Sequence, residues 1–184
     1  MDDRLWLRQM RRGNIAALHA IYEAYKSDLL TIAMSLLADP NGAEDCLHDV
    51  FVTLASKASE LRVHGKLRPY LVACVTNRAK DLLRRRRHTL SMSEEESMQI
   101  PMEQSEALDL LADCEETRRI QACLASIPYE QREAITLHLH GKLTFREIAR
   151  LQGVSVYTVQ SRYRYGLERV RKLLQKNGIN EAAR

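Results

Sequence analysis

Apolar residues recur at steps of three and four along the N-terminal half of the chain, which is the spacing of one helix face. The first stripe predicts a helix from about Leu18 to Leu36. Asp-Pro-Asn-Gly at 39–42 interrupts the period, and a second stripe then runs from Ala43 to Leu54. A third helix is expected from about Leu67 to Arg87, after a loop over 60–66. Residues 1–88 are therefore predicted to form one helical module.

The helical period fades after this module. Between about 88 and 108 the residues are polar and acidic, and Pro101 interrupts them. Such a segment buries too little apolar surface to offset its ordering entropy, so 89–108 is predicted to be a flexible acidic linker. Helix-spaced apolar residues resume over 109–184. The pattern predicts an all-α fold with two small helical modules joined by a flexible linker, and the scarcity of glycine and aromatic residues agrees with it.

The clearest functional pattern lies between Thr144 and Leu174. Thr144 and Glu147 have the spacing of a capping box, Gly153 marks a turn, and Ser155 is placed to cap a longer helix with basic residues. This order is typical of a helix-turn-helix, whose second helix reads base edges in the major groove. The side chains expected on its first turns are Tyr157, Thr158, Gln160, Ser161, Arg162 and Arg164. A solvated amphipathic helix in a helical hairpin is the simpler alternative.

Charge is distributed unevenly along the chain, whose formal net charge of +4 permits nucleic-acid binding without requiring it. The run of four arginines at 84–87 attracts phosphate, although cations also favour helix C-termini. The second predicted helix carries an acidic face instead. Acidic side chains repel DNA, so this face is expected to contact a protein partner, unless it is an ordinary solvated face.

Catalytic and metal-binding patterns are not found in the sequence. The cysteines at 46, 74, 114 and 123 are far apart and are expected to be reduced thiols. His138 and His140 are two residues apart, so a helix directs them to different faces, and no metal site is predicted. Without a nucleophile–base pair or a phosphate-binding glycine loop, we expect neither an enzyme nor a cofactor. An apolar run of about 18 residues and a signal peptide are also lacking, which predicts a cytoplasmic protein.

Three segments can be compared with known families. They are NGAEDCLHDVFVTL, LRPYLVACVTNRAKDLLRRRR and the region from IPYEQREAITL to the end of the helix-turn-helix. Together they resemble RNA polymerase sigma factors of the small extracytoplasmic-function type. The resemblance covers about 17–87, which is similar to sigma region 2, and 116–174, which is similar to region 4. It implies a promoter-recognition subunit that binds core RNA polymerase and promoter DNA, as duplex at the −35 element and melted at the −10 element. It also implies a cognate anti-sigma factor.

The resemblance assigns residues to three surfaces by position. The polymerase-docking residues are Glu44, Asp45, His48 and Asp49. The residues that contact the −10 element are His64 and Lys66, in the loop over 61–67, with Asn77, Arg78, Lys80 and Arg84. Thr144, Ser155 and Tyr165 join the six side chains of the helix-turn-helix as the −35 surface. Ala55 and Tyr70 stand where family members often have Trp, and Gln160 stands where a basic residue is common. These departures concern DNA preference rather than the class of protein.

Two other classes of protein are compatible with parts of the pattern. A conventional regulator would use the helix-turn-helix alone, with the N-terminal module for dimerisation, and would bind duplex DNA without polymerase. A helical mimic that titrates a sigma inhibitor would keep the acidic face but would need no base-reading residues. Gln160, Arg162 and Arg164 argue against the mimic.

Overall fold

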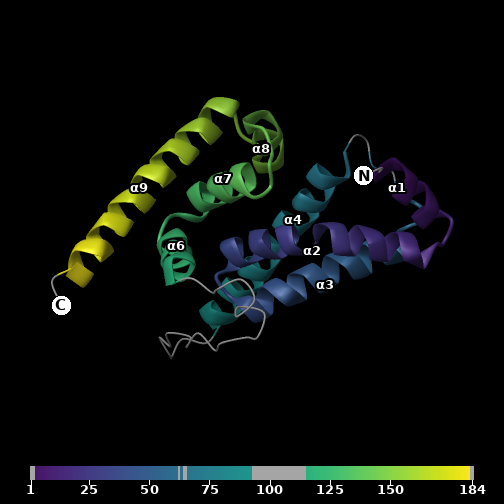
Figure 1. Cartoon of the computed structure of the whole chain (residues 1–184), viewed down its shortest axis with the longest axis horizontal. Coiled ribbons are helices and arrows are strands. Elements are labelled where there is room, and N and C mark those ends of the chain that lie inside the picture. The colour runs from purple at the N-terminus through teal and green to yellow at the C-terminus, as the bar shows by residue number, and fades with distance from the viewer. Residues whose placement is uncertain (1–2, 62, 64–65, 93–114, 183–184) are drawn as a thin grey trace.

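The computed structural model describes the backbone of residues 3–61, 63, 66–92 and 115–182, and within these ranges all regular structure is helical. Figure 1 shows the order of the helices. They are α1 (Asp3–Arg11), α2 (Ile15–Leu37), α3 (Pro40–Ser56), α4 (Leu67–Met92), α6 (Glu115–Ala125), α7 (Tyr129–Leu139), α8 (Phe145–Gln152) and α9 (Val156–Ala182). None of the helices described is both long and apolar enough to cross a membrane.

Helices α2, α3 and α4 pack around one core, with α1 against α2 (Figure 1). Ile21 and Ile32 of α2 and Leu71 of α4 are completely buried there. The Cys46 thiol of α3 is also buried and donates to the Val75 carbonyl at 3.6 Å. Burial raises the pKa of this thiol to about 12, so Cys46 serves as a small apolar side chain.

Helix α1 was not predicted from the sequence. It has nine residues, and its buried side chains are Leu7 and Met10, too short a stripe for the period to reveal. It is fixed to α2 partly by the Tyr25 hydroxyl, which donates to Asp3 Oδ1 at 3.0 Å. A contact across 22 positions of the chain has no signature in local periodicity.

Helix boundaries differ from the expected ones where caps decide them. Helix α2 begins three residues earlier than predicted, because the Asn14 side chain accepts a hydrogen bond from the Ala16 amide. The predicted break at 39–42 is narrower, since Pro40 stands at the first position of α3. Helix α4 continues to Met92 rather than ending at Arg87, so residues 89–92 of the predicted linker are helical. The rest of that linker lies outside the described residues.

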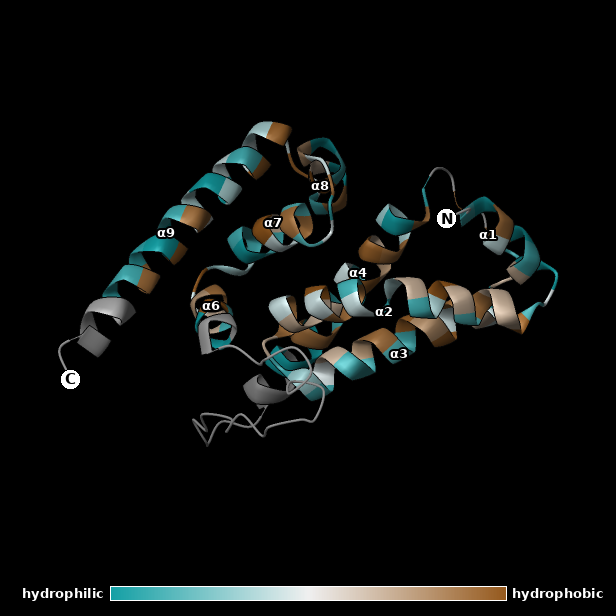
Figure 2. Ribbon diagram, in the orientation of Figure 1, coloured by the Kyte–Doolittle hydropathy of each residue, from teal (hydrophilic) through white to brown (hydrophobic). Residues whose placement is uncertain are grey.

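In the C-terminal half, α7 and α9 pack closely, with α6 and α8 beside them. Gly166 permits this approach, because a Cβ there would lie 2.8 Å from Ile135 Cδ1 and 3.1 Å from Gln131 Cβ. Brown and teal bands alternate along α9 in Figure 2, as the helical period predicted. The apolar side includes Val159 and Val170, which are buried.

The two halves of the chain also touch each other. Helices α6 and α7 lie against α2 (Figure 1), and the buried cluster of α2–α4 continues into Ala134 and Leu137 of α7. A hydrogen bond from Gln121 Nε2 to Ser35 Oγ, 3.4 Å long, crosses the same boundary. The two helical groups therefore share part of their apolar core in this structure, and the C-terminal group has a second buried cluster of its own, made of Cys123, Leu124, Ile127, Ile135 and Val170.

Candidate functional surfaces

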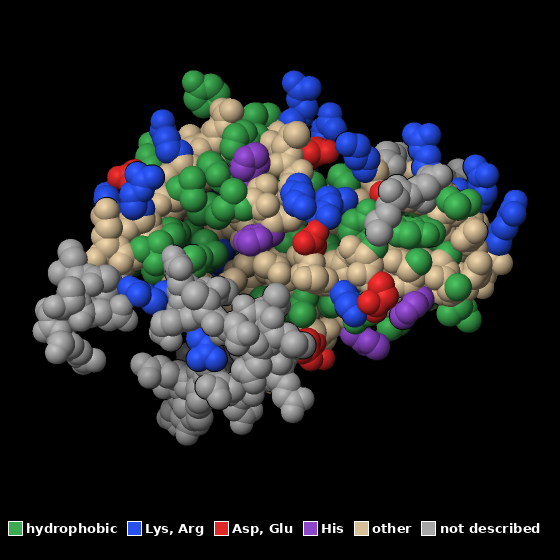
Figure 3. Space-filling model, in the orientation of Figure 1, with side chains coloured by type: hydrophobic (Ala, Val, Ile, Leu, Met, Phe, Trp, Pro, Cys, Tyr) green, Lys and Arg blue, Asp and Glu red, His purple; other side chains and the backbone are tan. Residues whose placement is uncertain are grey.

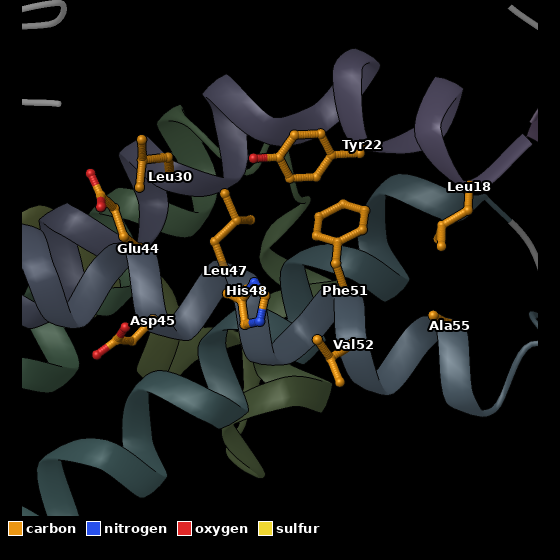
Figure 4. Close-up of a pocket in the computed structure, with 10 residues that line it drawn as sticks. All are labelled: Leu18, Tyr22, Leu30, Glu44, Asp45, Leu47, His48, Phe51, Val52 and Ala55. Atoms are coloured by element: carbon orange, nitrogen blue, oxygen red, sulfur yellow. The ribbon is translucent and has the colours of Figure 1, made fainter. Parts of the chain in front are cut away.

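A groove of about 650 Å³ runs between α2 and α3. Figure 4 shows Tyr22 and Phe51 facing each other across it. Their ring centroids are 5.0 Å apart at 80°, the edge-to-face arrangement that aromatic pairs favour. The remaining lining residues are Leu18, Leu30, Glu44, Asp45, Leu47, His48, Val52 and Ala55. An apolar floor with carboxylates at one end suits a partner helix that has an apolar stripe and cations beside it.

The predicted acidic face of α3 divides into two parts. Glu44, Asp45 and His48 are exposed and line the groove. Asp49 is directed to α4 instead, where its Oδ2 accepts from Arg78 Nε at 2.8 Å and also from Arg78 Nη2. The resemblance assigned Asp49 to the polymerase-docking surface and Arg78 to the −10 surface. In the structure these two side chains bind each other and thereby link α3 to α4.

The face of α4 predicted to contact the −10 element is partly open. Asn77 and Arg84 are exposed, and Arg84 pairs with Asp81 of the same helix at 3.0 Å. Lys66 is exposed just before α4, whereas His64 lies outside the described residues. Lys80 is directed to the C-terminal half, where its ammonium lies 2.8 Å from Glu133 Oε1.

The arginine run at 84–87 is not a uniform basic tract. Arg86 forms an ion pair with Asp39, the residue just before α3, and is 40% exposed. Its guanidinium lies over Gly42, where a Cβ would meet Nη2 at 2.7 Å. Arg86 thus helps to hold the start of α3 against the end of α4. This contact joins residues 47 positions apart, so the charge run alone did not reveal it.

The helix-turn-helix has the local structure that its sequence predicted. The Thr144 hydroxyl accepts from the Glu147 amide at 3.3 Å, and Glu147 Oε2 accepts from the Thr144 amide at 2.8 Å, which confirms the capping box. Gly153 ends α8 with φ +67°. Ser155 Oγ accepts from the Thr158 amide at 3.1 Å and thereby caps α9. The hydroxyls of Thr144 and Ser155 are engaged at helix starts in the free protein.

We predict that Thr144→Ala lowers the free energy of unfolding by about 1 kcal/mol, because the first turn of α8 loses its acceptor. Urea unfolding followed by circular dichroism measures this. Thr31→Ala is the matched control, since the Thr31 hydroxyl donates to the Ser27 carbonyl of the preceding turn and caps no helix start. Equal losses in the two variants would contradict a capping role.

The pH dependence of this cap has a definite sign. Hydrogen bonds from Thr144, the backbone amide first, lower the pKa of Glu147 below its usual value. A lowered folded-state pKa gives stability that is present above the unfolded-state pKa and is lost as pH falls through the folded-state value. Alanine at 144 keeps the amide and loses only the hydroxyl that donates to Glu147 Oε2, so the part of the stability difference that comes from this hydrogen bond should be lost as the solution is acidified through that range.

Three predicted base readers stand outward on α9. Tyr157 is 82% exposed, and Gln160 and Arg164 are exposed on the following turns. The Arg164 guanidinium lies 5.0 Å from the ring centroid of the exposed Tyr165. In the view of Figure 3, Lys and Arg side chains stand along the edge formed by α9, α8 and α1. An exposed helix start with amide, guanidinium and aromatic groups has the donors and acceptors that base edges require.

Arg162 differs from these neighbours. It is half-buried, and its Nη1 donates to Gln152 Oε1 at 2.7 Å. Gln152 Nε2 in turn donates to Glu133 Oε2 at 3.1 Å. Arg162 thus binds to α8 and, through it, to α7. Sequence reasoning missed Glu133 altogether, although a carboxylate just before the apolar residues Ala134 and Ile135 was an available signal.

Metal ligands are not gathered anywhere in the described part of the chain: no group of three or more His, Cys, Asp or Glu side chains is close enough to hold an ion. Cys114 lies outside the described residues, and Cys46 and Cys74 form no disulfide within the described part of the chain. Burial raises the pKa of Cys74, as it does for Cys46.

Comparisons with known proteins match both halves of the chain. The family model for sigma-70 region 2 matches residues 21–89, and that for sigma-70 region 4 matches 117–170. These ranges agree with the two segments in which the resemblance was found. A curated relative, the ECF RNA polymerase sigma factor SigK of Mycolicibacterium vanbaalenii, is 28% identical over 172 residues, covering 91% of this chain and 87% of its own. SigK of Mycobacterium tuberculosis H37Rv is 27% identical over 173 residues, 91% of either chain.

Two solved structures have a similar fold. One is the sigma factor RpoE in complex with the anti-sigma factor NepR from Bartonella quintana, with TM-score 0.68 and 19% identity, covering 85% of this chain and 97% of that one. The other is CnrH in complex with the cytosolic domain of CnrY, with TM-score 0.68 and 21% identity, covering 95% and 97%. The likeness supports the all-α arrangement of the two helical groups.

Proposed function

The chain belongs to the sigma-70 family, as a factor of the extracytoplasmic-function type, and from this premise we propose which of its surfaces perform the family's function. A member of this family binds core RNA polymerase and directs promoter recognition, DNA melting and transcription initiation. We assign polymerase docking to the α2–α3 groove, −10 contact to α4 with the loop before it, and −35 contact to the start of α9. We propose that residues 1–88 form the region 2 module and that residues 109–184 form the region 4 module.

The groove is the observation that carries the docking assignment. It combines an aromatic pair and aliphatic side chains with Glu44 and Asp45 at one end (Figure 4). Val52, on the same helix, is 52% exposed at its edge. Apolar contact supplies affinity, and the carboxylates select a partner with cations at the matching positions. The surface fits a protein helix better than DNA, which the carboxylates repel.

We expect Asp45→Arg to weaken binding to core polymerase by about 2–5 kcal/mol, because reversal puts a cation where the interface receives an anion. Asp45 is exposed, so the fold should be unchanged. Titration of labelled core polymerase with the purified variant measures the loss.

Glu23→Arg is the matched control for charge. Glu23 is an exposed carboxylate of α2 that pairs with Lys26 and does not line the groove. It should bind core polymerase like the parent. Equal affinity of parent and Asp45→Arg would contradict the docking assignment.

The DNA assignments rest on exposure and chemical type. On α4, Asn77 and Arg84 are solvent-accessible and lie on one face with Lys80, at steps of three and four. On α9, Tyr157, Gln160 and Arg164 extend outward from the first turns. Thr144, Ser155, Thr158 and Arg162 are engaged in caps or side-chain hydrogen bonds in the free protein. We assign these four residues to positioning the helix-turn-helix as well as to the −35 surface.

Three further properties belong to the same proposal. An anti-sigma factor is present in the RpoE structure that this fold resembles, and we propose that a cognate anti-sigma factor also binds this chain. We further propose that the chain works in the cytoplasm and performs no bond chemistry of its own, since the polymerase carries the active site. The region 2 match favours this function over a regulator that uses its helix-turn-helix alone. Run-off transcription with core polymerase and genomic fragments separates the two.

A further inference from the structure

One carboxylate connects the two halves of the protein. Glu133 of α7 is 2% exposed, and its Oε1 lies 2.8 Å from the ammonium of Lys80 on α4. Its Oε2 accepts from Gln152 of α8, which accepts from Arg162 of α9. A continuous polar chain therefore joins the −10 face of α4 to the helix that is proposed to read the −35 element.

This ion pair depends on the contact between the halves. Burying a carboxylate destabilises a fold unless a cation and hydrogen bonds compensate its charge. For Glu133, Lys80 supplies such a cation. Burial raises the pKa of Glu133, and the Lys80 and Gln152 contacts act against that rise. If α7 moved away from α2 and α4, Glu133 would regain water and Lys80 would be released. The ion pair is thus formed in a closed arrangement, in which α7 lies against α2 and α4, and is broken in an open arrangement, in which α7 has moved away.

The closed arrangement also occupies the −10 face. The Lys80 ammonium bound to Glu133 is not available to a phosphate, and it keeps only 35% of its side-chain surface exposed. In the proposed function a DNA phosphate would pair with Lys80, and in this structure the Glu133 carboxylate takes that role. Asn77 and Arg84, on the same face, stay exposed. The −10 face is therefore incomplete rather than covered entirely.

The closed arrangement also contains a buried polar group that destabilises it. Tyr129 of α7 packs against the shared core, and its hydroxyl is buried with no hydrogen-bond partner among the described residues. A buried polar group without a partner is destabilising, and opening would return the hydroxyl to water. The apolar contacts of Ala134 and Leu137 favour closure. Because one contribution favours closure and the other opposes it, a partner that binds the open form can shift the equilibrium.

We propose that Glu133 and Lys80 form an ionic latch that holds the free protein closed, with α7 in place of the −10 strand at Lys80. Binding to core polymerase and promoter DNA would separate the halves and release Lys80. The effect on DNA rests on the proposed function of α4, whereas the closure itself does not. The two parts are therefore tested separately.

The closure is tested on the full chain without DNA, by small-angle X-ray scattering. Lys80→Glu places two carboxylates together, and the radius of gyration should rise above that of the parent. The double variant Lys80→Glu with Glu133→Lys restores an opposite pair and should return to the parent value. Arg84→Glu is the matched control, since it reverses a charge of the same helix that is 80% exposed and that, among the described residues, pairs with Asp81. An unchanged radius for Lys80→Glu would overturn the latch.

The effect on DNA is tested by fluorescence anisotropy with a single-stranded −10 oligonucleotide and the free protein. Glu133→Gln keeps the side-chain shape and removes the charge, so it should bind about five- to thirtyfold more tightly than the parent, the effect of 1–2 kcal/mol. Lys80→Met combined with Glu133→Gln should lose this gain, because the released cation is missing. If the variants open in scattering but Glu133→Gln gains no affinity, the closure stands and the assignment of Lys80 to the −10 strand fails.

Discussion

Replacing Asn77, Lys80 and Arg84 together by alanine is expected to abolish promoter opening while sparing holoenzyme assembly and −35 binding. Unpairing and unstacking a base costs a few kcal/mol, and contacts made only with the single strand must offset this cost. The three side chains lie on one face of α4 and supply such contacts in the proposed function. Permanganate reactivity of thymines at the start site should disappear.

A pre-melted bubble template makes the test specific. If the triple variant fails only at melting, activity should return on the bubble template, because the bases of that template are already unpaired. A double variant, Arg11→Ala with Arg12→Ala, removes two exposed cations outside α4 and should open promoters normally. Normal opening of duplex promoters by the triple variant would show that α4 is not the melting surface. A conventional helix-turn-helix regulator would then be the better description.

Gln160→Ala and Arg164→Ala are each expected to cost about 1–3 kcal/mol at matched −35 bases and to relax the preference there. Both side chains are exposed on the early turns of α9. Gln suits adenine and Arg suits guanine as bidentate partners, so the loss should be confined to particular base pairs. Selection of randomised −35 sequences by the reconstituted holoenzyme measures the changed preference.

Arg169→Ala and Lys172→Ala provide the comparison. These exposed residues lie further along α9, and Lys172 forms a surface pair with Glu168. Any contact they make should be to phosphate, so their removal should weaken all sequences alike and reduce the salt dependence of binding. An unchanged −35 preference in both early-turn variants would contradict the placement of the recognition surface.

Local patterns explain which parts of this protein were predictable. The apolar stripes predicted α2, α3 and α4, and the spacing of Thr144 and Glu147 predicted a capping box that the structure confirms. The segments that resembled sigma regions 2 and 4 agree with the ranges the family models match. Each of these signals is contained within one helix or within consecutive helices, where residue spacing determines geometry directly.

Contacts between distant residues were not predictable in this way. Three such contacts join residues at least 22 positions apart: the Arg86–Asp39 pair, the Arg78–Asp49 pair and the Tyr25–Asp3 hydrogen bond. Helix α1 was missed because its two buried residues depend on α2 for their burial. A run of arginines has the same sequence pattern whether its side chains contact DNA or a carboxylate elsewhere in the fold.

The sequence by itself determined the all-α class, the helix-turn-helix with its caps, and the family to which the chain belongs. Only the tertiary structure decided which charges remain available to partners. It left Asn77, Gln160 and Arg164 exposed, and it paired Arg78 and Lys80 with carboxylates of other helices. The physical reason is that helix periodicity states which face a residue occupies, whereas its charge is compensated by whatever the packing of distant helices brings within reach.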